Sequence, residues 1–90
     1  IRLTIFRWLP PLVCITNFVN MKTEINIKFG QRVVELRKLK GIPQDELAYR
    51  CNIQRSYMGV IERGEKSVTL NTIEKIARGL EMSIIELMKF

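Results

Sequence analysis

The sequence predicts an all-α domain of five helices within residues 21–90. Apolar residues there recur at the three- and four-residue spacing of amphipathic helices, and capping residues precede several of these stretches. No segment alternates apolar and polar residues long enough to indicate a strand. The 90 residues fit one domain. A domain of this size buries only about 60% of its unfolded surface, so it gains stability from a partner.

The first two helices have recognisable start and stop signals. The first is expected over about residues 25–40, with Thr23 or Asn26 as its N-cap and Gly41 at its end. The second is expected over residues 44–51. It opens with two acids, which the helix dipole favours in a first turn.

The remaining three helices are also bounded by capping residues. The third is expected over residues 55–63 and stops at Gly64, which tolerates a left-handed conformation. The fourth follows Thr69 as its N-cap, and Ser83 and Glu86 form a capping box for the fifth. The apolar stripe of the fourth helix consists of Leu70, Ile73, Ile76, Ala77 and Leu80.

The stretch LAYRCNIQRSYMGVI places two short helices on either side of a tight corner. Ala48 supplies the small residue that a steep helix crossing needs, and Asn52 tolerates the positive φ of the turn. Ile53, Met58 and Ile61 supply apolar anchors. The pattern is typical of a helix-turn-helix, whose second helix enters the major groove of DNA.

Positive charge is concentrated in the half of the chain that contains this corner. Ten of the 15 basic residues lie between Lys22 and Lys66, whereas residues 67–90 hold equal numbers of acids and bases. A basic, asymmetric domain suggests a polyanionic partner such as nucleic acid or an anionic membrane surface. An ordinary basic surface is the plainer interpretation of the charge alone.

Several other chemistries find no support in the sequence. There is no His, and Cys14 and Cys51 stand alone, so no zinc-ligand cluster is available. No carboxylate pair or reactive thiol is left for catalysis, so we expect no enzyme, metal or cofactor. We also expect no small-molecule ligand and no membrane partner. The isolated cysteines fit a reduced, cytoplasmic setting.

Residues 1–20 differ from the rest of the chain. They hold no acid, the only Trp and a Pro10-Pro11 pair. They resemble a secretory signal only superficially, because the prolines interrupt the run and no small-x-small cleavage pattern follows. The run is also too broken for a membrane span. We expect an apolar extension outside the domain, which starts at Met21; the alternative is an arm that packs on a partner.

Residues 29–88 resemble the Cro/C1-type (XRE-like) helix-turn-helix domain. RSYMGVIERGEKSVTL and the following IEKIARGL are especially similar to the controller proteins of restriction–modification systems. The resemblance implies a five-helix bundle of the lambda-repressor-like type, a transcriptional regulator that binds double-stranded DNA, a homodimer, and an operator of paired half-sites. It also implies that Arg37 and Glu62 pair to lock the first helix to the third. Pro43 and Gln54 stand where the family usually has Ser or Thr caps.

Four residues of the third helix are predicted to contact bases. Arg55 can donate two hydrogen bonds to a guanine, and we favour this role over the alternative of a solvated arginine at a helix start. Ser56 can contact several base edges. Tyr57 can contact a base or phosphate, or pack on the second helix. Gly59 weakens the helix by about 1 kcal/mol relative to Ala, which makes sense if DNA approaches closely there.

Four further residues are predicted to contact phosphates. Gln44 begins the second helix, where backbone N–H groups and its side-chain amide can hold an anion. Arg63, Lys66 and Ser67 follow the third helix and can contact another part of the backbone. Arg63 can instead serve the helix C-terminus, where the dipole favours a cation.

The fifth helix holds more apolar residues than one face can bury. We expect Ile84 and Leu87 to join the core of the domain. We predict a symmetric homodimer joined through residues 80–90. The residues expected at its interface are Leu80, Met82, Ile85 and Met88.

Other functions remain open from the sequence. An antitoxin-type or phage-type repressor would use the same DNA-binding motif. A basic helical protein-interaction module belongs to a different class, and it would need apolar anchors on the exposed side of the third helix.

Overall fold

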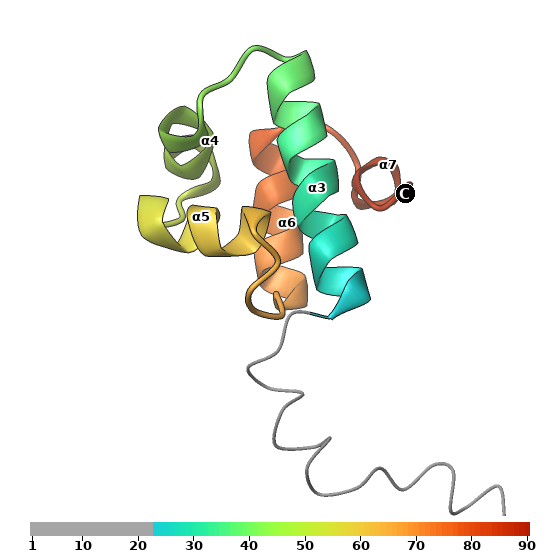
Figure 1. The fold of residues 1–90 in the computed structure, drawn as a ribbon. Coiled ribbons are helices and arrows are strands. Elements are labelled where there is room, and N and C mark those ends of the chain that lie inside the picture. The colour runs from blue at the N-terminus through green and yellow to red at the C-terminus, as the bar shows by residue number, and fades with distance from the viewer. Residues whose placement is uncertain (1–22) are drawn as a thin grey trace, which may run out of the picture.

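Five helices follow one another through residues 23–90, the part of the chain that the computed structural model describes (Figure 1). This part contains no strand, so the all-α fold class is confirmed for it, and the expected helix bounds are met to within a residue. The expectations for residues 1–20 lie outside the described part. The helices are α3 (Glu24–Leu39), α4 (Gln44–Cys51), α5 (Arg55–Glu62), α6 (Leu70–Gly79) and α7 (Ile84–Leu87).

Three of the helices begin with a side-chain cap. Thr23 is the N-cap of α3, and its hydroxyl accepts a hydrogen bond from the N–H of Asn26 at 3.3 Å. Thr69 caps α6 in the same way. Ser83 accepts from the N–H of Glu86 at 3.1 Å, which is one half of the predicted capping box. The Glu86 carboxylate instead lies 3.4 Å from the Lys89 ammonium.

The two helices of the corner begin without such caps, as their sequence indicates. Pro43 and Gln54 occupy the N-cap positions of α4 and α5 and make no side-chain cap hydrogen bond. The first-turn N–H groups of α5 therefore have no side-chain acceptor at their N-cap. Gly64 follows α5 with φ +70°, as expected of the residue that ends this helix.

Two helix crossings form the core, between α3 and α5 and between α4 and α6. Leu70 was expected on the buried stripe of α6 but is 82% exposed, because no described element packs over this position in the first turn. Ile84 was expected in the core but is 44% exposed, because Leu87 occupies the buried side of the single turn of α7. The buried residues at the centre are Val33, Leu47, Met58, Ile61, Ile76, Leu80 and Leu87.

Both crossings depend on a glycine that the sequence did not single out. A β-carbon on Gly30 would lie 2.5 Å from the carbonyl oxygen of Ile61, so α3 and α5 approach backbone to backbone. A β-carbon on Gly79 would overlap the Sγ of Cys51, so α6 and α4 approach through that thiol. Burial raises the pKa of the Cys51 thiol to about 11, which keeps it protonated and unreactive at neutral pH.

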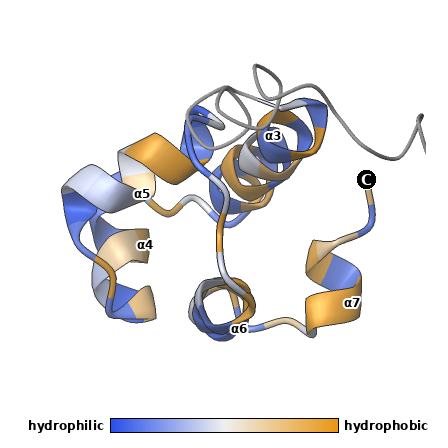
Figure 2. Ribbon diagram, turned by 90° about the horizontal axis from the view of Figure 1, so that it is seen from below, coloured by the Kyte–Doolittle hydropathy of each residue, from blue (hydrophilic) through white to orange (hydrophobic). Residues whose placement is uncertain are grey.

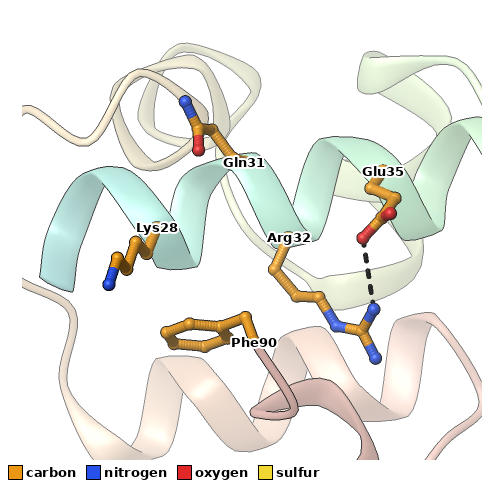
Figure 3. Close-up of a pocket in the computed structure, with 5 residues that line it drawn as sticks. All are labelled: Lys28, Gln31, Arg32, Glu35 and Phe90. Atoms are coloured by element: carbon orange, nitrogen blue, oxygen red, sulfur yellow. Dashed lines mark hydrogen bonds and ion pairs between the residues drawn. The ribbon is translucent and has the colours of Figure 1, made fainter.

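Helix α7 is fastened to α3 by Arg32. Its guanidinium donates to the carbonyl oxygens of Glu86 at 2.8 Å and of Leu87 at 3.2 Å, and pairs with Glu35 on its own helix at 3.2 Å. These carbonyls belong to the last turn of α7, and that of Glu86 also accepts the Lys89 N–H at 3.3 Å. Figure 3 shows the ring of Phe90 below α3, between Lys28 and Arg32.

We predict that Gly79→Ala destabilises the domain by about 1–3 kcal/mol, because its new methyl group overpacks against Cys51. Adding Cys51→Ala removes the sulfur and should recover part of this loss. The nearest remaining neighbours of the new methyl group are then backbone atoms of residue 51 at 3.4–3.5 Å, an ordinary contact distance. Gly30→Ala is the control: it meets backbone oxygens, so Cys51→Ala should not relieve it. Urea unfolding at fixed protein concentration measures the coupling; strictly additive Gly79 and Cys51 effects would contradict the packing argument.

Candidate nucleic-acid interface

The corner between α4 and α5 has the geometry that the sequence predicts. Asn52 follows α4 with φ 58° and ψ 45°, the left-handed conformation. The Ile53 N–H donates to the Ala48 carbonyl at 2.9 Å, which closes the turn. Ala48 is buried and Ile53 packs against the core, so the direction of α5 is fixed by both.

Helix α5 presents polar side chains on the side away from the core. Arg55 and Ser56 are exposed, while Met58 is buried beneath them. They border a shallow hollow of about 460 Å³ whose lining includes no acid. The hollow brings together five of the eight residues predicted to contact DNA: Gln44, Arg55, Ser56, Gly59 and Arg63.

Arg55 differs from the other arginines of the described residues, because it makes no ion pair there. Arg32, Arg37, Arg50, Arg63 and Arg78 each face a carboxylate within 4.0 Å. Helix α5 also has no acid in its first turn, so the positive end of its dipole and the Arg55 guanidinium repel each other. An exposed cation in such a position is available to an anionic partner.

Gly59 is buried because the side chain of Arg63 lies over it. A β-carbon at Gly59 would lie 3.1 Å from Nη1 of Arg63, so this guanidinium lies at the edge of the hollow beside Gly59. Arg63 donates to Glu65 through Nε at 2.8 Å, and this hydrogen bond and the charge of Glu65 raise the pKa of Arg63. A phosphate that binds Arg63 therefore competes with Glu65.

Gln44 connects the hollow to the scaffold. Its side-chain nitrogen donates to the Glu62 carboxylate at 2.9 Å, which leaves one amide N–H for another acceptor. Arg37 holds the same carboxylate through Nε at 2.9 Å and Nη2 at 3.2 Å, which confirms the pairing that the resemblance implied. In the first turn of α4, the Glu46 N–H donates to the Asp45 carboxylate at 2.9 Å and is therefore not free for a phosphate.

The other predicted DNA contacts lie outside this hollow. Lys66 is exposed and makes no ion pair in the described part of the chain. The Ser67 hydroxyl accepts from the side chain of Asn26 at 3.3 Å. Tyr57 is half-buried and packs against the core.

The residues predicted at the dimer interface are divided between core and surface. Leu80 is fully buried, so its assignment to the interface is wrong; it continues the buried side of α6 instead. Ile85 is 74% exposed, and Met82 and Met88 are half-buried. Figures 1 and 2 place α7 on the side of the molecule opposite α4 and α5.

Two further properties concern the described residues as a whole. None of their helices is both long enough and apolar enough to span a bilayer. They contain no group of three or more His, Cys, Asp or Glu side chains suited to hold a metal ion.

Comparison with known proteins gives consistent matches. Residues 33–87 match the helix-turn-helix family. The chain is 38% identical over 71 residues to Control protein C.BamHI of Bacillus amyloliquefaciens, covering 78% of this chain and 88% of that protein. It is also similar to the crystal structure of the restriction-modification controller protein C.AhdI from Aeromonas hydrophila, with 45% identity and a TM-score of 0.67 over 69% of this chain and 94% of that one.

A further similar structure is C.Esp1396I bound to a 19 base pair DNA duplex, with 32% identity and a TM-score of 0.68 over 72% of this chain and 87% of that one. The family match spans more than half of the sequence and includes all of α4, α5 and α6. The chain belongs to the helix-turn-helix family and is a transcriptional regulator similar to the restriction–modification controller proteins.

Proposed function

We propose that this regulator acts in the cytoplasm as a homodimer that binds an operator of two half-sites, with α5 in the major groove. The observation that carries the proposal is the hollow beside α5, where Arg55, unpaired within residues 23–90, lies next to Ser56 and Gln44. An arginine at the start of a helix in the major groove is placed to donate two hydrogen bonds to a guanine.

Phosphate contacts would set the register of α5 on the duplex. Arg63 and Gln44 line the hollow together with Gly59, and each has N–H groups beyond those donated within the domain. Lys66 lies further along the chain and is free of ion pairs in the described residues. Such contacts supply affinity without base preference.

Dimerisation fits the position of α7. Ile85 is exposed there together with Ile84 and Phe90, which are 44% and 49% exposed. Because α7 and the corner lie on opposite sides of the domain, a two-fold axis at α7 leaves both copies of α5 at the outer ends. A dimer of this kind reads two half-sites about one helical turn apart.

Duplexes selected by the full chain from a random pool should converge on a site with two related half-sites. Their affinity should fall by orders of magnitude between about 50 and 200 mM salt, because several phosphate contacts release counterions. Fluorescence anisotropy of selected and random duplexes measures both properties. Equal affinity for the two pools, or a flat salt dependence, would contradict operator binding.

Arg55→Ala should weaken the selected site by about 1–3 kcal/mol and relax the preference at one base pair per half-site. Arg50→Ala removes the same charge from α4, where Arg50 pairs with Glu46, and should leave the preference intact. Lys66→Ala should weaken all duplexes alike and lower the salt slope. Repeating the selection with each variant separates these effects; a uniform loss for Arg55→Ala would refute its assignment as a base contact.

Ile85→Asp together with Met88→Asp should give a folded monomer with much weaker operator binding, because both carboxylates enter the proposed interface. Ile85→Asp alone is the safer variant, since Met88 also packs against the core. Tyr49→Asp adds a carboxylate at a residue that is 83% exposed on α4 and should leave the dimer intact. Sedimentation and circular dichroism report assembly and folding; an intact dimer in both α7 variants would place the interface elsewhere.

A further inference from the structure

A second hollow lies on the other flank of α5, toward α6. Its volume is about 240 Å³, and it shares no residue with the hollow that contains Arg55. The residues that line it include no acid: Asn52, Ile53, Gln54, Tyr57, Thr72 and Lys75. None of the four residues that the sequence predicts as phosphate contacts is among them.

The charge of this second hollow comes from Lys75. Lys75 is exposed and makes no ion pair within residues 23–90. The neighbouring carboxylate of Glu74 is turned toward Arg78, at 3.5 Å. A cation without an acid beside it gives the hollow a positive potential.

Side chains with neutral hydrogen-bond donors line the same hollow as Lys75. Gln54 is exposed, and its side chain makes no capping bond to α5. The Thr72 hydroxyl lies 3.0 Å from that of Thr69, and Tyr57 contributes a phenol to the lining. One ammonium with an amide and hydroxyl groups is a donor set suited to the oxygens of a phosphodiester.

The two hollows lie on different flanks of one helix. At about 100° per residue, Arg55 and Tyr57 project from nearly opposite sides of α5, with Ser56 between them. A helix with its side chains is about 10–12 Å across and fills a major groove about 12 Å wide, so its two flanks face the two phosphate strands.

We propose that Lys75, with Gln54, Tyr57 and Thr72, binds a backbone phosphate of the strand opposite the one that Arg63 and Gln44 contact. This inference rests on the proposed function, because it takes α5 to lie in the major groove. It makes α6 part of the DNA interface and assigns the Tyr57 hydroxyl to the backbone rather than to a base.

The test compares Lys75→Gln with Arg78→Gln in the full chain. Both variants remove one positive charge from α6, but Arg78 does not line the hollow. On DNA selected by the wild-type chain, Lys75→Gln should lower the slope of log K against log salt by about 0.9 per bound lysine, or about 1.8 for a dimer. Arg78→Gln should keep the wild-type slope. Equal urea midpoints for the three proteins establish that folding is unchanged.

A scan with single neutral methylphosphonate linkages locates the contact. Within each half-site, one linkage should weaken the wild-type chain severalfold and Lys75→Gln hardly at all, and it should lie on the strand opposite the linkage that Arg63→Gln identifies in the same half-site. A wild-type slope for Lys75→Gln, or both linkages on the same strand of one half-site, overturns the inference. If the wild-type chain binds selected and random duplexes equally, operator recognition is overturned. The inference on Lys75 is still testable in that case, because the slope of log K against log salt can be measured on any duplex. Absence of DNA binding overturns both.

Discussion

The arrangement of the domain depends on the ion pair between Arg37 and Glu62. The two side chains are 14% and 6% exposed, and the guanidinium also donates to the Ile42 carbonyl at 3.1 Å. One nearly buried carboxylate thus holds α3, the start of α4 and the end of α5 together. Removing one partner from such a pair costs about 3–5 kcal/mol, because the other charge is left buried and unpaired. Gln44 binds the same carboxylate, so a single group positions both the scaffold and the surface that we propose faces DNA.

The ion pairs also divide the cations of the domain into paired and unpaired ones. Most arginines of residues 23–90 are held by carboxylates on their own or neighbouring helices. Arg55, Lys66 and Lys75 are exposed around α5 without such a partner in this part of the chain, and Lys38 and Lys40 are likewise unpaired at the end of α3. Because the paired arginines contribute little to the electrostatic field around the domain, the net charge understates how uneven that field is. Placing unpaired cations around one helix favours its approach to a polyanion.

Local rules explain why so much of the fold could be predicted from the sequence. Asn52 and Thr69 act within a few residues of their own position, so the turn and the start of α6 were both correct. Tertiary contacts are different. From the sequence, Leu80 fits both the apolar stripe of the fourth helix and a dimer interface, and only the placement of the neighbouring helices assigns it to the core. Gly79 is only a weak helix former in the sequence until Cys51 of α4 lies against it. Lys75 lies beside α5 only because α6 packs near it. No short-range signal in the sequence predicts this packing.

The hydrogen bonds from Arg32 to α7 link the proposed dimerisation to the integrity of the fold. A helix of four residues cannot persist alone in water, because nucleation costs more than so few hydrogen bonds return. The apolar side chains of α7 are thus arrayed in one orientation only while α3 is folded and donates to the Glu86 and Leu87 carbonyls. In the proposed dimer, a partly unfolded copy would therefore lack the surface needed for pairing. The Arg32 guanidinium, which completes the fold, would then also be required for dimerisation.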